Sequence, residues 1–297
     1  MKKKLKIAFS DFWGGWDPNN NFWTLMFNKL NITYEVVDDN SDLLISSCFG
    51  GSWSTKKSIK KIYWTGENWF RMDTKIEQLG GNSIIDIFDY VYSFDYNNYS
   101  NHFRFPLYLV DTIESNINDY NLILRKKNKD DLYKEFNNKN FCTFVQGNGN
   151  CKFRNDYFFD LNKIEKVDSF GPLFNNTGKI LDRVQKIEVT KNYKFQMAFE
   201  NSVYDGYVSE KIIDAFKSDI IPIYWGGSLI SNEFNDKSFI DVNQLGLESS
   251  LKLISEMSSD FELYWEYYNQ PIVREDQQSI SDRIEKLFDN LSQNLNF

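Results

Sequence analysis

Histidine and cysteine are scarce in this sequence of 297 residues, which contains one histidine and three cysteines. A single histidine, His102, excludes zinc sites built on several histidines and any Ser-His triad that needs a histidine elsewhere. The odd set Cys48, Cys142 and Cys151 argues against a disulfide framework, and it has no C-x-x-C metal-binding spacing. We expect His102 to be a partly packed surface residue.

Long apolar runs are also missing. No stretch of about 18 apolar residues occurs, so the sequence predicts no transmembrane segment. The basic start is followed by an apolar run that ends at Phe9, which is too short for a signal peptide. The net charge of -8 argues against nucleic acid as a partner. We therefore expect a soluble, cytoplasmic protein of the producing cell or its host, with the oligomeric state left open.

Hydrophobic and aromatic residues are plentiful, at 41% and 17%, and the length suits about two domains. Short apolar runs alternate with amphipathic stretches, which predicts an α/β fold with mostly parallel sheets. The expected strands cover residues 4–9, 33–37, 43–46, 61–65, 90–94, 141–145, 193–199 and 220–225. The expected helices cover residues 22–30, 154–163, 180–186, 209–216, 251–257 and 280–287.

A polar stretch over residues 112–140, rich in Asn, Lys and Asp, is expected to be a surface excursion and interdomain linker. We expect a Rossmann-like N-terminal domain over residues 1–135 and a second one over residues 136–297, with the last helix able to pack back on the first. Ligands of open α/β sheets bind at the carboxyl ends of strands. The site residues should therefore follow strands and face a cleft between the two halves.

The densest polar motif reads FENSVYDGYVSEK over residues 199–211 and follows an expected strand. Ser209 suits the N-cap of the next helix. Backbone N–H groups and Lys211 at that helix N-terminus form a natural seat for a diphosphate. Glu210 would face a sugar hydroxyl or a developing positive charge. An ordinary capped helix with a charge pair in its first turn accounts for the same residues.

A second motif, KIYWTGENW over residues 61–69, presents Glu67 in a turn after an expected strand. A carboxylate walled by Trp64 and Trp69 could have a raised pKa and accept a proton from a hydroxyl nucleophile. A surface glutamate in a loop is the alternative interpretation.

A third motif, FCTFVQGNGNCKFRN over residues 141–155, leads from a strand through a Gly/Asn loop to a helix that opens near Arg154. Arginine makes bidentate contacts with phosphate oxygens. The glycines form neither G-x-G-x-x-G nor a Walker pattern, and a solvent-facing arginine is the alternative.

Together these motifs resemble those of the α1,3/4-fucosyltransferases, family 10 of the glycosyltransferases, and most closely its soluble bacterial members. The family's patterns F-E-N, Y-V-T/S-E-K, P-V/I-x-x-G, T-G-E-N, F-D-Y and P-L-Y have counterparts in residues 199–201, 207–212, 221–226, 63–68, 88–90 and 105–108. Residues 234–240 resemble the stretch after the donor motif. The resemblance covers roughly residues 5–270, and Ser209 stands where many members have threonine.

The resemblance implies a GT-B fold and an inverting transfer of L-fucose from GDP-β-L-fucose to a glycan hydroxyl, α1,3 to GlcNAc or Glc. Glu67 would be the general base that deprotonates the acceptor. The residues implied to bind the donor are Arg154, Asn201, Tyr207, Glu210 and Lys211, with Arg154 and Lys211 on the phosphates. Trp13, Trp16, Asn68 and Trp69 are candidates for the acceptor side, although such aromatics also belong in cores.

The resemblance implies no cofactor beyond the donor GDP-fucose, and a divalent cation would at most stimulate the transfer. No aspartate has another two positions away, so the D-x-D pair of metal-dependent glycosyltransferases is absent, which favours Arg and Lys as the phosphate clamp. Two alternatives stay open: a GT-B transferase for another nucleotide deoxysugar, and an inactive carbohydrate-binding relative. The C-terminal region is shorter than in the bacterial members, so we do not expect membrane association through a basic tail.

Overall fold

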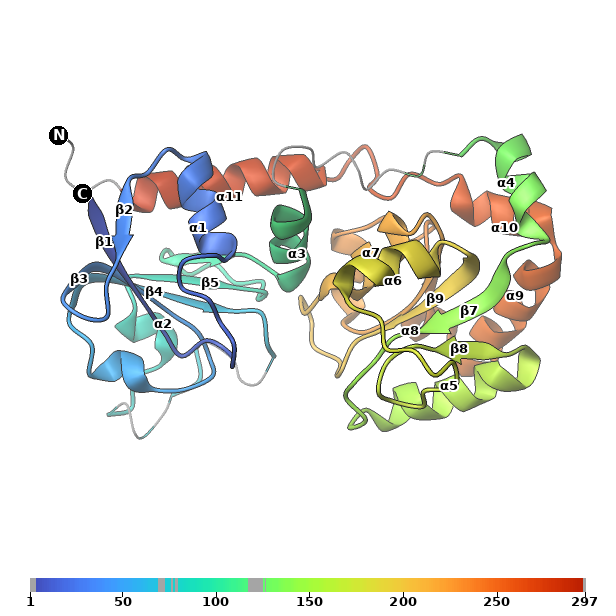
Figure 1. Ribbon diagram of the computed structural model, residues 1–297, viewed down its shortest axis with the longest axis horizontal. Helices are drawn as coiled ribbons and strands as arrows, with labels where there is room; N and C mark the ends of the chain where they lie inside the picture. The colour runs from blue at the N-terminus through green and yellow to red at the C-terminus, as the bar shows by residue number, and fades with distance from the viewer. Residues whose placement is uncertain are drawn as a thin grey trace. The chain divides into compact units, whose positions relative to one another are not determined.

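A computed structural model describes residues 4–68, 73–75, 77, 80–116, 125 and 127–295 of the chain. The chain forms two compact units, one of Met1–Tyr120 with Ser279–Phe297 and the other of Asn121–Gln278 (Figure 1). Each unit contains one sheet whose described strands pair in parallel, so the expected α/β class is confirmed.

The first unit has a six-stranded sheet in the order β2-β1-β3-β4-β5-β6. Its strands are β1 (Leu5–Ser10), β2 (Tyr34–Val36), β3 (Ser41–Ser46), β4 (Ser58–Thr65), β5 (Tyr90–Ser93) and β6 (His102–Arg104). Its helices are α1 (Phe22–Lys29), α2 (Ile84–Ile87), α3 (Leu107–Asn116) and α11 (Ile280–Asn294), with the 3-10 turn η1 (Ser52–Ser54). A capping box between Asn21 and Thr24 starts α1, whose apolar side is buried.

The C-terminal helix α11 belongs to this first unit. The hydroxyl of Tyr92 in β5 donates to Asn290 Oδ1 at 2.9 Å, and Arg283 Nη1 donates to the hydroxyl of Tyr108 at 2.9 Å. Both bonds join α11 to elements that lie more than 170 residues earlier in the sequence, and Figure 1 shows α11 beside α3.

The second unit has a five-stranded sheet in the order β11-β10-β9-β7-β8. Its strands are β7 (Asn140–Phe144), β8 (Val167–Ser169), β9 (Tyr193–Phe199), β10 (Ile221–Trp225) and β11 (Ile240–Asp241). Its helices are α4 (Lys129–Phe136), α5 (Lys152–Ile164), α6 (Arg183–Thr190), α7 (Glu210–Lys217), α8 (Val242–Leu245), α9 (Leu247–Ser259) and α10 (Phe261–Tyr268), with the 3-10 turn η4 (Ser228–Asn232). Every residue of β9 is buried, as expected for a central parallel strand covered on both faces.

The expected linker over residues 112–140 contains the boundary between the two units, but its two ends are helical rather than linker. Residues up to Asn116 continue α3, and α4 packs Phe136 against Phe261 with ring centroids 5.4 Å apart. Within this stretch, Arg125 donates to the carbonyl oxygens of Tyr267 at 2.8 Å and Ser238 at 2.6 Å. The polar composition hid these contacts because the partners come from distant parts of the sequence.

The helix expected at residues 180–186 lies further along, at Arg183–Thr190. Asp182 accepts the backbone N–H of Gln185 at 2.8 Å, and the Gln185 side chain accepts the N–H of Asp182 at 3.2 Å. This capping box starts α6 at residue 183.

Candidate functional site

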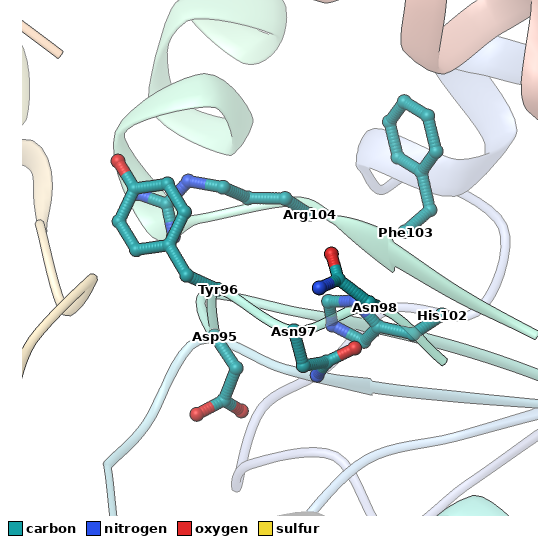
Figure 2. Close-up of a pocket in the computed structure, with 7 residues that line it drawn as sticks. All are labelled: Asp95, Tyr96, Asn97, Asn98, His102, Phe103 and Arg104. Carbon is teal, nitrogen blue, oxygen red and sulfur yellow. The ribbon is translucent and has the colours of Figure 1, made fainter. Parts of the chain in front are cut away.

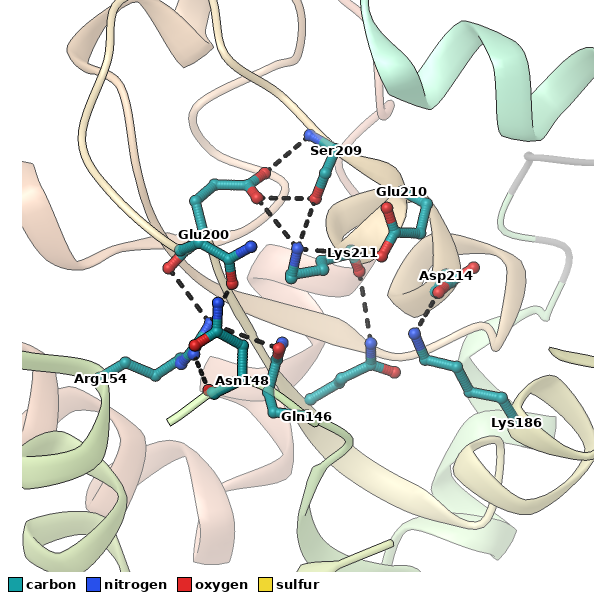
Figure 3. A network of polar contacts seen from close by, with 11 residues as sticks. Gln146, Asn148, Arg154, Lys186, Glu200, Ser209, Glu210, Lys211 and Asp214 are labelled. Atoms are coloured by element: carbon teal, nitrogen blue, oxygen red, sulfur yellow. Dashed lines mark hydrogen bonds and ion pairs between the residues drawn. The ribbon is translucent and has the colours of Figure 1, made fainter. Parts of the chain in front are cut away.

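Two polar loops of the second unit meet where β7 and β9 end, at the edge where parallel sheets bind ligands. One loop runs from β7 to α5 and carries Gln146 and Asn148. The other runs from β9 to α7, from Glu200 to Ser209. Figure 3 shows their polar side chains converging with Arg154 of α5 and Lys211 of α7.

Arg154 lies fully buried in the first turn of α5. Its Nη1 donates to Asn201 Oδ1 at 2.8 Å and to Gln146 Oε1 at 3.3 Å, and its Nη2 donates to the carbonyl oxygen of Asn148. Burial lowers the pKa of Arg154, although arginine stays protonated over the ordinary pH range. The solvent-facing alternative is therefore wrong: Arg154 is a buried cation held by neutral acceptors.

Lys211 is the second buried cation, and Glu200 is its partner. Its Nζ donates to Glu200 Oε2 at 3.2 Å and to Ser209 Oγ at 2.8 Å. Burial by itself would lower the pKa of Lys211, but the carboxylates of Glu200 and Glu210 outweigh it and raise that pKa. Lys211 therefore keeps its positive charge although its side chain is only 9% exposed.

Ser209 stands at the N-cap of α7, as expected, but its hydroxyl does not cap the helix. The hydroxyl donates to Glu200 Oε2 at 2.6 Å, and the backbone N–H of Ser209 donates to Glu200 Oε1 at 2.8 Å. The Glu200 carboxylate thus takes three hydrogen bonds from Ser209 and Lys211 with no exposed side-chain surface.

Glu200 and Asn201 are consecutive, and they connect the two cations. The carbonyl oxygen of Glu200 accepts from Arg154 Nη1 at 3.4 Å, while its carboxylate binds Lys211. Sequence analysis placed Glu200 in the F-E-N pattern but gave it no role. Its signal was weak because a glutamate after a strand is usually exposed, and burial depends on partners that arrive nine and eleven residues later.

Glu210 is part-exposed, and its Oε1 lies 3.8 Å from Lys211 Nζ. Burial would raise its pKa, but Lys211 and Lys186 outweigh that effect and lower it, so Glu210 is a carboxylate at neutral pH. Lys186 is held in turn by an ion pair with Asp214 of α7. Tyr207 is buried, and its backbone N–H donates to the carbonyl oxygen of Tyr204 at 3.0 Å.

In the first unit, Glu67 lies two residues beyond the end of β4 and is partly exposed. The hydroxyl of Thr65 accepts the Glu67 N–H at 3.0 Å and donates to its carbonyl oxygen at 3.0 Å, which fixes the backbone of this turn. Asn68 follows it, also partly exposed. The ring of Trp64 is buried, and its Nε1 donates to the carbonyl oxygen of Phe105 at 3.3 Å.

The aromatic loop after β1 forms a cluster. Trp16 stacks on Phe12 with centroids 3.8 Å apart, and Trp13 lies edge-on to Trp16 at 4.8 Å. Trp16 is partly buried in this cluster, whereas Trp13 is 37% exposed at its rim. Trp69, the remaining candidate for the acceptor side, lies outside the described residues.

Within the described ranges, no helix is both long enough and apolar enough to cross a membrane. Over the same part of the chain, no group of three or more His, Cys, Asp or Glu side chains is placed to hold a metal ion.

Two family models match the chain. The N-terminal domain model of the α-(1,3)-fucosyltransferase FucT matches residues 7–111, and the C-terminal model of glycosyltransferase family 10 (fucosyltransferase) matches residues 134–287. The chain belongs to glycosyltransferase family 10. The expected resemblance is therefore confirmed.

Curated members of family 10 are similar to this chain over part of their length. The α-(1,3)-fucosyltransferase FucT of Helicobacter pylori is 28% identical over 271 residues, which cover 80% of this chain and 54% of that protein. The mouse (Mus musculus) 4-galactosyl-N-acetylglucosaminide 3-α-L-fucosyltransferase 9 is 29% identical over 116 residues, which cover 38% of this chain and 32% of that protein. This family 10 chain thus spans about half, or less, of the length of these relatives.

A solved structure agrees with the family. The crystal structure of an α1,3-fucosyltransferase with GDP-fucose matches at a TM-score of 0.72 and 25% identity, covering 99% of this chain and 91% of that one. This family 10 protein has the expected GT-B fold, with one parallel sheet in each of its two α/β units.

Proposed function

We propose that this chain moves L-fucose from GDP-β-L-fucose to a hydroxyl of a glycan, with α1,3 linkage to GlcNAc or Glc. The observation that carries the proposal is the buried cation pair Arg154 and Lys211, joined through Glu200 and Asn201 where β9 ends. Membership of family 10 and a structural relative solved with GDP-fucose support the same donor.

The donor diphosphate is placed between Arg154 and Lys211, at the N-terminus of α7. Burial strengthens the attraction of both cations for phosphate oxygens, because little water competes for them. Lys211 brings a full positive charge, since its pKa is raised. Asn201 and Tyr207 lie in the loop between β9 and α7. The carboxylate of Glu210 is available to a sugar hydroxyl or to the positive charge that develops at the anomeric carbon.

The reaction is a single displacement. The acceptor oxygen attacks the anomeric carbon of fucose, the bond from that carbon to the β-phosphate oxygen breaks, and the acceptor proton passes to the Glu67 carboxylate. GDP departs with the bonding electron pair, and Arg154 and Lys211 balance its added charge. Attack opposite the leaving group converts the β-linked donor into an α-linked product.

The two units divide the work under this proposal. The second unit binds the nucleotide sugar, since it carries Arg154, Lys211 and the family's C-terminal region. The first unit supplies the base Glu67 and binds the acceptor, with Trp13, Trp16, Asn68 and Trp69 as candidate contacts.

Ligand-induced stabilisation tests the donor. We expect GDP-fucose to raise the melting temperature by about 4 °C or more at about 100 times its Kd, because a ligand that binds only the folded state stabilises it by about 2.7 kcal/mol at that concentration. GDP-mannose, UDP-sugars and dTDP-sugars serve as the comparison. A larger shift with another nucleotide deoxysugar would replace the proposed donor. A rate of GDP release that does not depend on added acceptor would contradict transfer.

Calorimetry tests the phosphate clamp. Lys211→Ala should weaken GDP binding about tenfold or more through the lost charge-assisted contact. Lys152→Ala is the matched control, since that lysine also opens a helix of this unit but its side chain is 87% exposed. Unchanged GDP affinity in Lys211→Ala would remove Lys211 from the clamp.

A further inference from the structure

A pocket of about 310 Å³ opens in the first unit between the end of β5 and the strand β6 (Figure 2). Its lining residues are Asp95, Tyr96, Asn97, Asn98, His102, Phe103 and Arg104. We call it the 95–104 pocket. Its volume is at the small end of the range for small-molecule sites, ~300–1,000 Å³, and suits a sugar residue better than a dinucleotide.

Strand register places this pocket beside the proposed base. Thr65 of β4 pairs with Ser93 of β5, and Ser93 pairs with Arg104 of β6. Glu67 follows Thr65 by two residues, and Asp95 follows Ser93 by two residues. Neighbouring strands lie about 4.8 Å apart, so the pocket begins one strand away from the turn that carries Glu67, at the same edge of the sheet.

The pocket is built around fixed polar groups. Ser93 Oγ donates to Asp95 Oδ2 at 2.8 Å and lies 2.8 Å from His102 Nε2. Because the hydroxyl proton of Ser93 is committed to Asp95, Nε2 of His102 is the donor in the second bond, which leaves Nδ1 as an acceptor. The guanidinium carbon of Arg104 lies 4.0 Å from the ring centroid of Tyr96.

The charges of the described lining residues cancel. Burial, and secondarily the cation of Arg104, lower the pKa of His102 to about 4, so the imidazole is neutral near pH 7. Asp95 and Arg104 then contribute one charge of each sign. An anionic sugar gains no net attraction from lining charges that cancel, whereas an uncharged sugar meets amide and carboxylate groups that bond its hydroxyls. Tyr96, 41% exposed, offers an aromatic ring to a pyranose face.

We infer that the 95–104 pocket binds an uncharged sugar residue of the acceptor glycan beside Glu67. This inference rests on the proposed function, and it adds a specific acceptor subsite that the motifs did not predict. Tyr96 and the amides of Asn97 and Asn98 hold the sugar, and the hydrogen-bond chain Asp95–Ser93–His102 fixes the pocket wall.

The test is a kinetic comparison with GDP-fucose and an array of uncharged and anionic oligosaccharides, read by mass spectrometry. We expect the best acceptors to be uncharged. With the best of them, Tyr96→Ala should raise the acceptor KM about tenfold while the Kd for GDP stays within about twofold, and Tyr96→Phe should restore a KM near that of the unmodified chain. Tyr99→Ala is the matched control, because Tyr99 is 44% exposed in the same loop and does not line the pocket.

The outcomes separate the two proposals. Transfer that proceeds with an unchanged acceptor KM in Tyr96→Ala overturns the pocket and leaves the proposed function intact. A preference for anionic acceptors overturns the class of sugar assigned to it. Failure to fucosylate any member of the array overturns the proposed function and the pocket assignment with it.

Discussion

The Glu200 carboxylate lies 3.2 Å from Lys211 Nζ, with no exposed surface of its own, and is the main reason that this buried lysine keeps its charge. The same residue accepts from Arg154 through its carbonyl oxygen. One buried glutamate thus contacts both cations of the proposed phosphate clamp, and replacement of its side chain should act on Lys211, because Arg154 binds the main-chain carbonyl oxygen.

Glu200→Gln keeps the shape of the side chain and removes the charge. Without the Glu200 charge, burial lowers the pKa of Lys211, and GDP affinity should decline about tenfold. The affinity should decline further as the pH rises toward about 9, which the unmodified chain does not show. Calorimetric titration of GDP at several pH values measures this. Glu188→Gln, at an exposed glutamate of α6, is the control. A uniform loss at all pH values would mean that Glu200 has only a structural role.

Gly226 packs against this arrangement. A Cβ placed there would lie 2.3 Å from the hydroxyl of Tyr224 and 2.8 Å from Glu200 Cγ, closer than carbon atoms approach in proteins. Gly226→Ala should therefore lower the free energy of unfolding by about 1–3 kcal/mol and also weaken GDP binding, since Glu200 has to move. Chemical denaturation and calorimetry measure the two effects. Gly14→Ala, with no atom within 4 Å of the added carbon, should show neither.

His102 makes stability depend on pH. Its pKa is about 4 when folded and 6.5 ordinarily, so the unfolded chain binds the proton more readily between these values. The free energy of unfolding should therefore fall as the pH drops through this range, by an amount on the order of 1–3 kcal/mol. The groups that face His102 are Ser93 and Arg104, with Asp95 beyond Ser93.

His102→Gln should flatten that dependence, as measured by urea denaturation at several pH values between about 4 and 7. The sequence has no other histidine, so no second imidazole titrates in this window. An unchanged pH profile in His102→Gln would show that carboxyl groups alone produce the slope.

The strands were the most predictable part of the fold, because strands that are buried on both faces consist of continuous apolar runs. The strand Tyr193–Phe199 has the bounds expected of it, and Ile221–Trp225 differs by one residue. Helix α4 was missed because only Leu132 and Phe136 of its residues are buried, and Phe136 packs on Phe261, which is far away in the sequence. A local pattern contains no information on such a partner.

The residue types of the candidate site were predictable from the sequence, whereas the hydrogen bonds and ion pairs between them were less so. Arg154 and Lys211 were found by motif, and their burial came from contacts that no spacing reveals. Ser209 matched the N-cap preference, yet its hydroxyl oxygen accepts from Lys211 Nζ instead of from a helix N–H, and its proton is donated to Glu200. The 95–104 pocket had no sequence signal, since it arises from the register of β5 and β6.

The most direct test of the central claim is the rate of fucose transfer by Glu67→Gln, measured together with its GDP-fucose affinity. We expect affinity within about twofold of the unmodified chain and transfer reduced by ~10² or more, the usual contribution of a general base. Turnover near that of the unmodified chain, at matched donor saturation, would contradict the assignment of Glu67 and the transfer chemistry built on it.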